Sequence, residues 1–344
     1  METRKVQRLG PSTVAMTLPA EWAEEYSVEK GDEVALRTGG NGTMIVMPKS
    51  VDVTEATATI TSDDLEGEAV ERAIVAQYVL GRRTIRIERT EGVLEGPTID
   101  AVYRAETQLM GLGVIEETPE SIAIRCSVDP EDFTLDSLLG RLESTGATMR
   151  GEAVKALTRG DTDLANRALN RERQANKIFV LLLRLIFTAA QNPNVARTVG
   201  LEDDLPLIGY RAIAKNLELT ADNAEDIAEI VFEADGEPLA VDGTTIRRIR
   251  EFTDQVDELT ELAVRSVVDL EFDGTIEARE LFHEIDDRER EILEDLPEME
   301  NDDLLEIREV LVSLSQTAEY AMRNAEIGVN LSLDQESAYV SRIR

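Results

Sequence analysis

Residues 218–229 read ELTADNAEDIAE, and residues 319–330 read EYAMRNAEIGVN. Both segments contain the triplet Asn-Ala-Glu, at 223–225 in the first and at 324–326 in the second, an offset of 101 residues. Around the first triplet, apolar residues recur at the spacing of one helical face, and acidic residues run beside them. A helical pattern that returns at a fixed offset predicts an internally duplicated helical protein. The apolar face of the first copy is Ile213, Leu217, Ala224, Ala228 and Val231.

The chain from about residue 132 onward has helical periodicity almost throughout. We expect long helices at 134–160, 161–192, 205–236, 242–270, 275–296 and 301–332, separated by Gly, Asn and Pro breaks. Together with the duplication, this predicts two three-helix bundles, at about 132–236 and 242–332. The region 132–344 resembles the PhoU family, whose members are tandem three-helix bundles that regulate phosphate uptake.

Residues 1–50 are predicted to form four short strands and one short helix. We expect strands at 4–8, 14–18, 33–37 and 43–47, with Pro19 at the start of the helix. Such a short segment cannot enclose a core alone, which predicts an obligate dimer. A strand, turn and strand lead into Thr17-Leu-Pro19, and a helix and the sequence VEKGDEV at 28–34 follow. This pattern resembles the AbrB (SpoVT-AbrB-like) swapped-hairpin domain.

The AbrB resemblance implies an interlocked homodimer that binds DNA through basic side chains around the first hairpin. The matching candidates are Arg4, Lys5 and Arg8, with Arg37 as a weaker one. Residues 1–50 hold six Lys and Arg against seven Asp and Glu, net −1, which leaves 30 against 63, net −33, elsewhere. A near-neutral segment on an acidic protein tolerates a phosphate backbone. The helix after Pro19 departs from the family because it is acidic, so a dimerisation module without DNA contact is the alternative.

Residues 51–131 are predicted to form a small α/β unit in the order βαβαββ. That order suits a split βαβ sandwich. The segment has no glycine-rich phosphate loop and no His/Cys cluster, so we expect a connector or dimer-stabilising role, with a small-ligand sensor as the alternative. The predicted fold is therefore multidomain α+β: an N-terminal swapped-hairpin β domain, a small α/β connector and a C-terminal all-α part.

The composition is strongly acidic, with 70 Asp and Glu against 36 Lys and Arg and a net charge of −34. With Arg favoured over Lys, this resembles proteins of salt-accumulating haloarchaea. Cys126 is the sole cysteine, which excludes a disulfide framework and favours a reducing compartment. The longest apolar run, at 178–190, is too short to span a bilayer and contains Arg184. We therefore expect a cytoplasmic protein without membrane insertion.

The PhoU resemblance also implies a duplicated acidic site. In that family, Glu/Asp-x-x-x-Asp motifs on two helices of each bundle converge and can hold metal ions. The matching residues of the first bundle are Glu172, Asn176, Glu218 and Asp222. Their counterparts in the second bundle are Asp286, Arg290, Glu319 and Arg323.

The two sets differ in charge: the first sums to −3 and the second to zero. Residues four apart share a helical face, and oxygen ligands suit a hard divalent ion such as Mg²⁺ or Mn²⁺, or an iron centre. In the second set, two arginines replace the cation, because a guanidinium forks onto a carboxylate. We predict one divalent ion per chain, in the first bundle. The alternative is a solvated acidic helix face.

No enzyme is expected. The one histidine, His283, leaves no Ser/His/Asp or Cys/His set and no Glu-x-x-His di-iron motif pair. The resemblances imply a cytoplasmic, homodimeric, DNA-associated regulator of phosphate uptake. The alternative is an adaptor that does not bind DNA and controls a phosphate ABC transporter or a sensor kinase. A metal-storage or redox bundle is disfavoured by the neutral second set.

Overall fold

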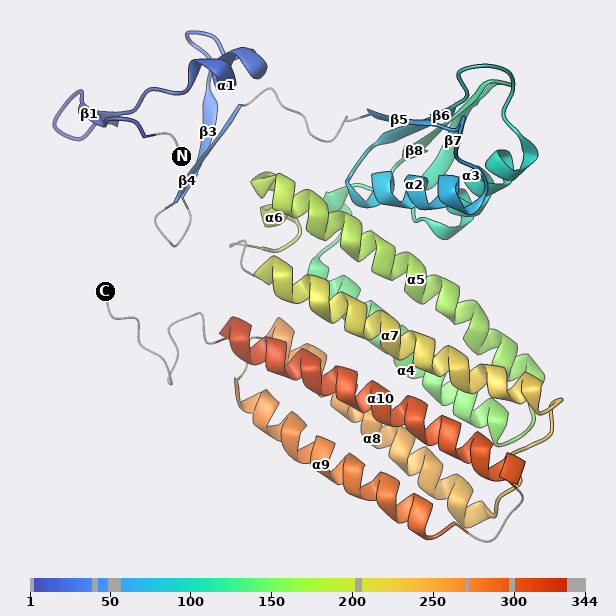
Figure 1. The fold of residues 1–344 in the computed structure, drawn as a ribbon. Helices are drawn as coiled ribbons and strands as arrows, with labels where there is room; N and C mark the ends of the chain where they lie inside the picture. The colour runs from blue at the N-terminus through green and yellow to red at the C-terminus, as the bar shows by residue number, and fades with distance from the viewer. Residues whose placement is uncertain are drawn as a thin grey trace. The chain divides into compact units, whose positions relative to one another are not determined.

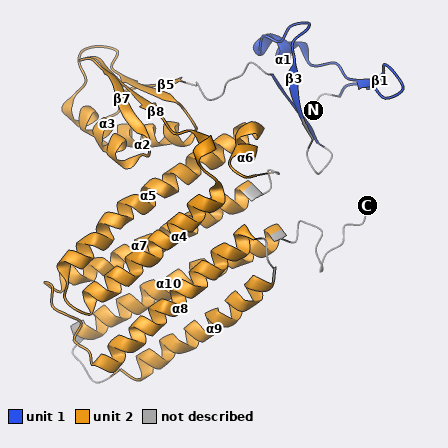
Figure 2. Ribbon diagram, turned by 180° about the vertical axis from the view of Figure 1, so that it is seen from behind, with its two compact units in different colours: residues 1–56 blue, residues 57–344 orange. Residues whose placement is uncertain are grey.

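The computed structural model describes residues 3–38, 43–48, 57–201, 206–269, 272–296 and 301–332. The chain divides into two compact units, Met1–Ala56 and Thr57–Arg344 (Figure 1; Figure 2). The predicted multidomain α+β class, with small hairpins first and helical bundles last, is confirmed. The division into domains at 1–50, 51–131 and 132–344 stays a prediction.

The first unit consists of two hairpins and one short helix. Strand β1 (Gln7–Arg8) pairs antiparallel with β2 (Val14–Ala15), and β3 (Val34–Thr38) pairs antiparallel with β4 (Met44–Pro48). Helix α1 (Ala20–Glu25) follows Pro19, as predicted. All the side chains described in this unit are exposed or partly exposed. The described part of the unit therefore has no core of its own.

The second unit begins with a four-stranded sheet. Its elements are β5 (Thr57–Thr61), α2 (Glu68–Val79), β6 (Thr84–Glu88), α3 (Gly96–Gln108), β7 (Leu112–Glu117) and β8 (Ser121–Cys126). This confirms the βαβαββ order, but the expected split βαβ arrangement is wrong. The sheet order is β5-β6-β8-β7, so the parallel strands β5 and β6 are direct neighbours with no strand between them. The helices α2 and α3 pack together against the sheet (Figure 1).

The long helices begin and end within three residues of their predicted limits. Side chains of Thr134, Asp161 and Asp242 accept backbone N–H bonds at the starts of three of them. The short helix α6 (Pro193–Thr198) lies in the connection after the second long helix of the first bundle. This connection is longer than the corresponding one in the second bundle. The long helices are α4 (Leu135–Leu157), α5 (Thr162–Gln191), α7 (Pro206–Glu233), α8 (Gly243–Val268), α9 (Phe272–Glu294) and α10 (Asn301–Ser332).

These helices form two bundles, α4-α5-α7 and α8-α9-α10, that pack side by side. The pairs α4/α7 and α8/α10 meet at the centre, while α5 and α9 lie on the two outer sides (Figure 1). One buried apolar cluster contains Leu157 and Ile227 of the first bundle and Phe252 and Leu314 of the second. The bundles therefore share a core.

The contact between α7 and α10 agrees with the offset of 101. The Asn216 amide donates to the Asn324 oxygen at 2.7 Å, and the Asn223 amide donates to the Thr317 hydroxyl at 3.1 Å. At the offset of 101, Thr317 is the counterpart of Asn216, and Asn324 is the counterpart of Asn223. Each asparagine of α7 therefore bonds to the counterpart of the other asparagine. Two repeats related by a pseudo-twofold axis, with α7 antiparallel to α10, produce this pattern.

The α/β part is joined to α5 by Arg184, inside the apolar run. Its buried guanidinium donates to the carbonyls of Tyr78, Gly81 and Arg82 at the end of α2, two of them at 3.1 Å. These bonds satisfy carbonyls that a helix end leaves without partners. The run is the predicted buried helix. Among the described residues, no helix combines the length and the apolar character needed to cross a membrane.

Candidate functional site

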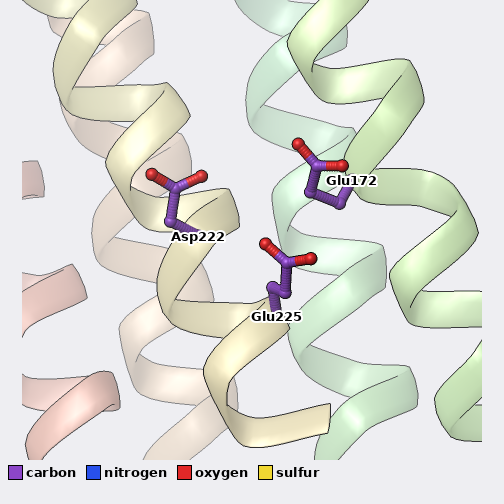
Figure 3. A group of neighbouring side chains, drawn as sticks. All are labelled: Glu172, Asp222 and Glu225. Atoms are coloured by element: carbon purple, nitrogen blue, oxygen red, sulfur yellow. The ribbon is translucent and has the colours of Figure 1, made fainter. Parts of the chain in front are cut away.

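Three carboxyl groups converge between α5 and α7 in the first bundle. Glu172 of α5 faces Asp222 and Glu225 of α7, and one oxygen of each lies within 4.8 Å of the others (Figure 3). Asp222 and Glu225 are three residues apart and so share a helical face. The helices α5 and α7 pack against each other, and Ala175, Ala221 and Ala224 are buried in the apolar cluster that they share.

Burial shifts the acidity of this cluster. Burial, followed by the charge of Glu218, raises the pKa of Asp222 to about 6. Burial, followed by the charges of Glu172 and Glu229, raises the pKa of Glu225 to about 7. Burial also raises the pKa of Glu172. Burial and neighbouring negative charges both disfavour the ionised form of a carboxyl group. A bound proton or cation would therefore stabilise this cluster.

The ligand set predicted from the sequence overlaps with this cluster in two residues. The structure brings Glu172 and Asp222 together, and the side chain of Asn176 hydrogen-bonds to the Glu172 carboxylate. Glu218 instead pairs with Lys215, whose ammonium lies 5.6 Å from the centre of the Phe179 ring.

The third carboxylate of the cluster, Glu225, was missing from the predicted set. The sequence did contain a signal for it. Acidic residues at 218, 222, 225 and 229 form one acidic stripe along the helix. Glu225 lies three residues after Asp222, on the same helical face.

The counterpart positions in the second bundle are neutralised within each helix. On α9, Arg290 pairs with Asp286 and, at 2.7 Å, with Asp287. On α10, Arg323 pairs with Glu319 at 3.3 Å, and both side chains are 57% exposed. In the described part of the chain, the one group of three potential metal ligands is that of the first bundle.

The basic residues named as DNA-binding candidates lie on the two hairpins of the first unit. Arg4, Lys5 and Arg8 are exposed in and just before β1. The Arg8 guanidinium donates to the Pro11 carbonyl at 3.4 Å, across the β1–β2 turn. Arg37 stands opposite Ile45 in the β3–β4 pair, on the other hairpin. Three of the four candidates therefore lie in or just before the first hairpin.

Comparison with known protein families places two domains on this chain. Residues 139–231 match the PhoU domain, and residues 7–53 match the antidote-toxin recognition domain of the bacterial antitoxin MazE. The chain thus carries a PhoU domain behind a MazE/AbrB-like domain, which confirms both resemblances.

Among solved structures, the chain is similar to PhoU from Pseudomonas aeruginosa, with 19% identity, a TM-score of 0.48, and coverage of 57% of this chain and 94% of that one. It is also similar to the phosphate transport system regulatory protein PhoU from Streptococcus pneumoniae, with 16% identity, a TM-score of 0.48, and coverage of 58% and 94%. No curated protein matches the chain significantly.

Proposed function

We propose that this chain is a homodimeric, DNA-associated regulator of phosphate uptake, not an enzyme. The observation that carries the proposal is the combination of a PhoU domain with a MazE/AbrB-like unit whose first hairpin exposes Arg4, Lys5 and Arg8. The helical part would sense the phosphate state or a partner, and the N-terminal unit would bring that state to promoters. Such a protein works in the cytoplasm.

Dimerisation through the first unit is supported by the exposure of apolar side chains in its described part. Val6, Leu9 and Leu36 are 66%, 71% and 62% exposed. Apolar side chains at this exposure contribute little to folding until another surface removes them from water. A second copy of the same unit, with interlocked hairpins, would cover them and complete a core. The same dimer would place two copies of the basic hairpin against a duplex.

The distribution of charge along the chain supports the first unit as the part that faces DNA. The segment 1–50 has a net charge of −1, whereas the rest of the chain carries −33. A DNA backbone would be repelled by the acidic bundles and tolerated by the near-neutral unit. The exposed basic groups at the start of the unit would make phosphate contacts, which position a protein on DNA.

We further propose that the first bundle holds one divalent cation through Glu172, Asp222 and Glu225. Three carboxylate oxygens within 4.8 Å of one another fit around a hard cation with bond lengths of about 2.0–2.6 Å. When bound, the ion would supply positive charge to a cluster that is otherwise held at raised pKa. The carboxylates would then ionise fully and tie α5 to α7. Asn176 would orient Glu172.

The experiment that tests the regulator is genome-wide crosslinking and pull-down of the tagged protein, with and without phosphate in the medium. We expect peaks upstream of phosphate-transport genes that change with phosphate. The triple variant Arg4→Glu, Lys5→Glu and Arg8→Glu should abolish them. The matched control reverses three exposed arginines of the second unit, Arg72, Arg265 and Arg279, and should leave the peaks in place.

One observation favours a second function, an adaptor that does not bind DNA. Helix α1, next to the basic hairpin, carries Glu21, Glu24 and Glu25 and no basic residue. In that case the first unit is a dimer clamp, and the bundles control a phosphate transporter or a sensor kinase directly. A flat crosslinking profile in both media, with phosphate control unchanged in the triple variant, would support the adaptor and overturn the DNA-associated regulator.

A further inference from the structure

A groove of about 540 Å³ runs between α7 and α10, where α7 ends and α10 begins. Its apolar lining comes from Ile230 on α7 and from Leu305 and Val312 on α10. Leu305 is 54% exposed and Val312 is 41% exposed. The two residues are seven apart, or two helical turns, so they form one apolar stripe along the groove.

The rim of the groove is mainly acidic. Asp226, Glu229 and Glu233 line the α7 side, at a spacing that keeps all three on one helical face. The α10 side adds Glu309 and one cation, Arg308. Four acidic groups against one basic group give the groove a net charge of −3. An apolar floor with an acidic rim therefore characterises this surface.

The two ends of the α7–α10 contact carry different residues at matching positions of the repeat. With the offset of 101, Ile230 corresponds to Leu331, and Val310 corresponds to Gly209. At the far end of the α7–α10 contact, Leu331 packs onto Gly209, where an added Cβ would come within 2.9 Å of a Leu331 methyl group. At the groove end, the larger Val310 is fully buried at the matching position. A glycine thus allows close approach at the far end, and a larger residue stands at the matching position of the groove end.

The neighbouring position changes in character as well. Asp226, on the rim, corresponds to Ile327, whose methyl group would lie 3.1 Å from a Cβ at position 209. One repeat therefore seals the contact with an apolar side chain, and the other places a carboxylate at the same point. Both differences favour an open, negatively charged groove at one end of a contact that is closed at the other.

We propose that this groove binds an amphipathic helix of a partner protein, with an apolar stripe flanked by Lys and Arg. Helices of this kind dock their apolar face into a groove through anchors at i, i+3 or i+4, and i+7, which matches the stripe formed by Leu305 and Val312. The basic flanks would face Asp226, Glu229 and Glu233. A second copy of this chain is the weaker occupant, because two acidic rims would oppose each other.

The test measures binding of a labelled amphipathic peptide to the full-length protein by fluorescence anisotropy. The probe is a helical peptide of leucine and lysine about 14 residues long, which is four turns. We expect a dissociation constant below about 100 μM, and we expect it to increase as the salt concentration rises. Leu305→Ser with Val312→Ser should weaken binding at least about 10-fold, since buried apolar anchors dominate such contacts. Glu229→Lys with Glu233→Lys should have a similar effect and leaves the apolar stripe intact.

Two controls separate the groove from general charge attraction. Glu280→Lys with Glu284→Lys makes the same charge change at the same spacing on the exposed side of α9. Ile208→Ser removes an apolar side chain that is 77% exposed outside the groove. Neither control should change peptide affinity by more than about twofold, the scatter expected for near-neutral surface contacts.

Three results would overturn the proposal. The wild-type protein could fail to bind the peptide, or the α9 control could weaken binding as much as the groove variants do, which would mean attraction to acidic surface in general. Sedimentation could also show that Leu305→Ser dissociates an oligomer, which would make the occupant a second copy. Circular dichroism verifies folding, and if the serine variant is unfolded, the Glu229 and Glu233 charge reversal alone decides.

Discussion

The two helical bundles carry charged side chains at corresponding positions, but these side chains have different partners in the two bundles. In the first bundle, Asp222 and Glu225 face Glu172 across two helices, partly withdrawn from water. In the second bundle, Arg323 stands where the first has Asp222 and pairs with Glu319 on its own helix. A charge pair four residues apart on one helix neutralises itself with a small gain, whereas convergent carboxylates need a proton or a cation from outside. We therefore expect the first bundle to bind a cation and the second bundle not to bind one.

The largest effect is expected from removing a carboxylate of the first cluster. Glu225→Gln should lower the affinity for Mn²⁺ about 100-fold, or about 2.7 kcal/mol, because a neutral amide replaces one of three anionic ligands. Titration calorimetry of the full-length protein with Mn²⁺ measures both affinity and stoichiometry. Wild-type protein should bind one ion per chain.

Two controls sharpen this result. Glu319→Gln removes an acid of the second bundle and should leave Mn²⁺ affinity unchanged. Glu218→Gln should lower it less than about fivefold, because Lys215 already holds that carboxylate and its effect on the ion is only a weak long-range charge. A loss for Glu218→Gln equal to that for Glu225→Gln would instead support the ligand set predicted from the sequence.

The partial success of that ligand set has a physical reason. Residues 218, 222, 225 and 229 all lie on one acidic stripe, so helical periodicity predicts the stripe but cannot choose among its members. The choice depends on how far α7 is rotated and shifted against α5, and on the ion pair between Lys215 and Glu218. Both are properties of tertiary packing. The PhoU resemblance supplied Glu172 and Asp222, which the structure brings together.

Converting the second bundle into the first should create a cation site. Glu326 of α10 corresponds to Glu225 of α7 at the offset of 101. Asp286 of α9 corresponds to Glu172 of α5 at an offset of 114, because the connection that follows α5 is longer than the one that follows α9. Arg290→Asn with Arg323→Asp therefore restores a complete set. We expect the Mn²⁺ stoichiometry to rise from one to two, with the second ion bound about 10-fold more weakly because its ligands are more exposed. A folded double variant that still binds one ion would show that side-chain identity alone does not make the site.

The pH dependence of stability should also distinguish the bundles. Asp222 and Glu225 have folded-state pKa values of about 6 and 7, raised from 3.8 and 4.5. The folded protein therefore binds more protons than the unfolded chain, and the contribution of these groups to stability falls as pH rises from about 4 to 7. In chelator, Glu225→Gln should be more stable than wild type by about 1 kcal/mol at pH 7.5, after allowance for solvent screening, and equal to it near pH 4.

Urea unfolding at several pH values measures this difference. Glu319→Gln, which changes an exposed acid of the second bundle, should follow the wild-type curve at every pH. Saturating Mn²⁺ should reverse the order at pH 7.5, because the ion stabilises only the folded state that can bind it. An unchanged difference between Glu225→Gln and wild type across this pH range would contradict the raised pKa of Glu225.

Periodicity predicted the long helices well and the contacts between elements poorly. The apolar stripes and the Gly, Asn and Pro breaks predict where the six long helices begin and end. The placement of β6 directly beside β5 was not predicted, because strand order depends on non-local pairing. Nor was the role of Arg184: an arginine inside an apolar run signals a buried partner, but the partner, the end of α2, lies about a hundred residues away in sequence.

The smallest effect is expected from Arg323→Ala in the second bundle. The ion pair with Glu319 is 57% exposed on both sides and lies on a single helix, so its loss should cost at most about 0.5 kcal/mol and less at high salt. Urea unfolding at low and high ionic strength measures it. A loss near 2 kcal/mol would mean that the guanidinium joins α10 to α9 as a tethered cation. The second bundle would then be stabilised by an internal substitute for the metal ion, and the contrast between the repeats would lie in the source of the positive charge.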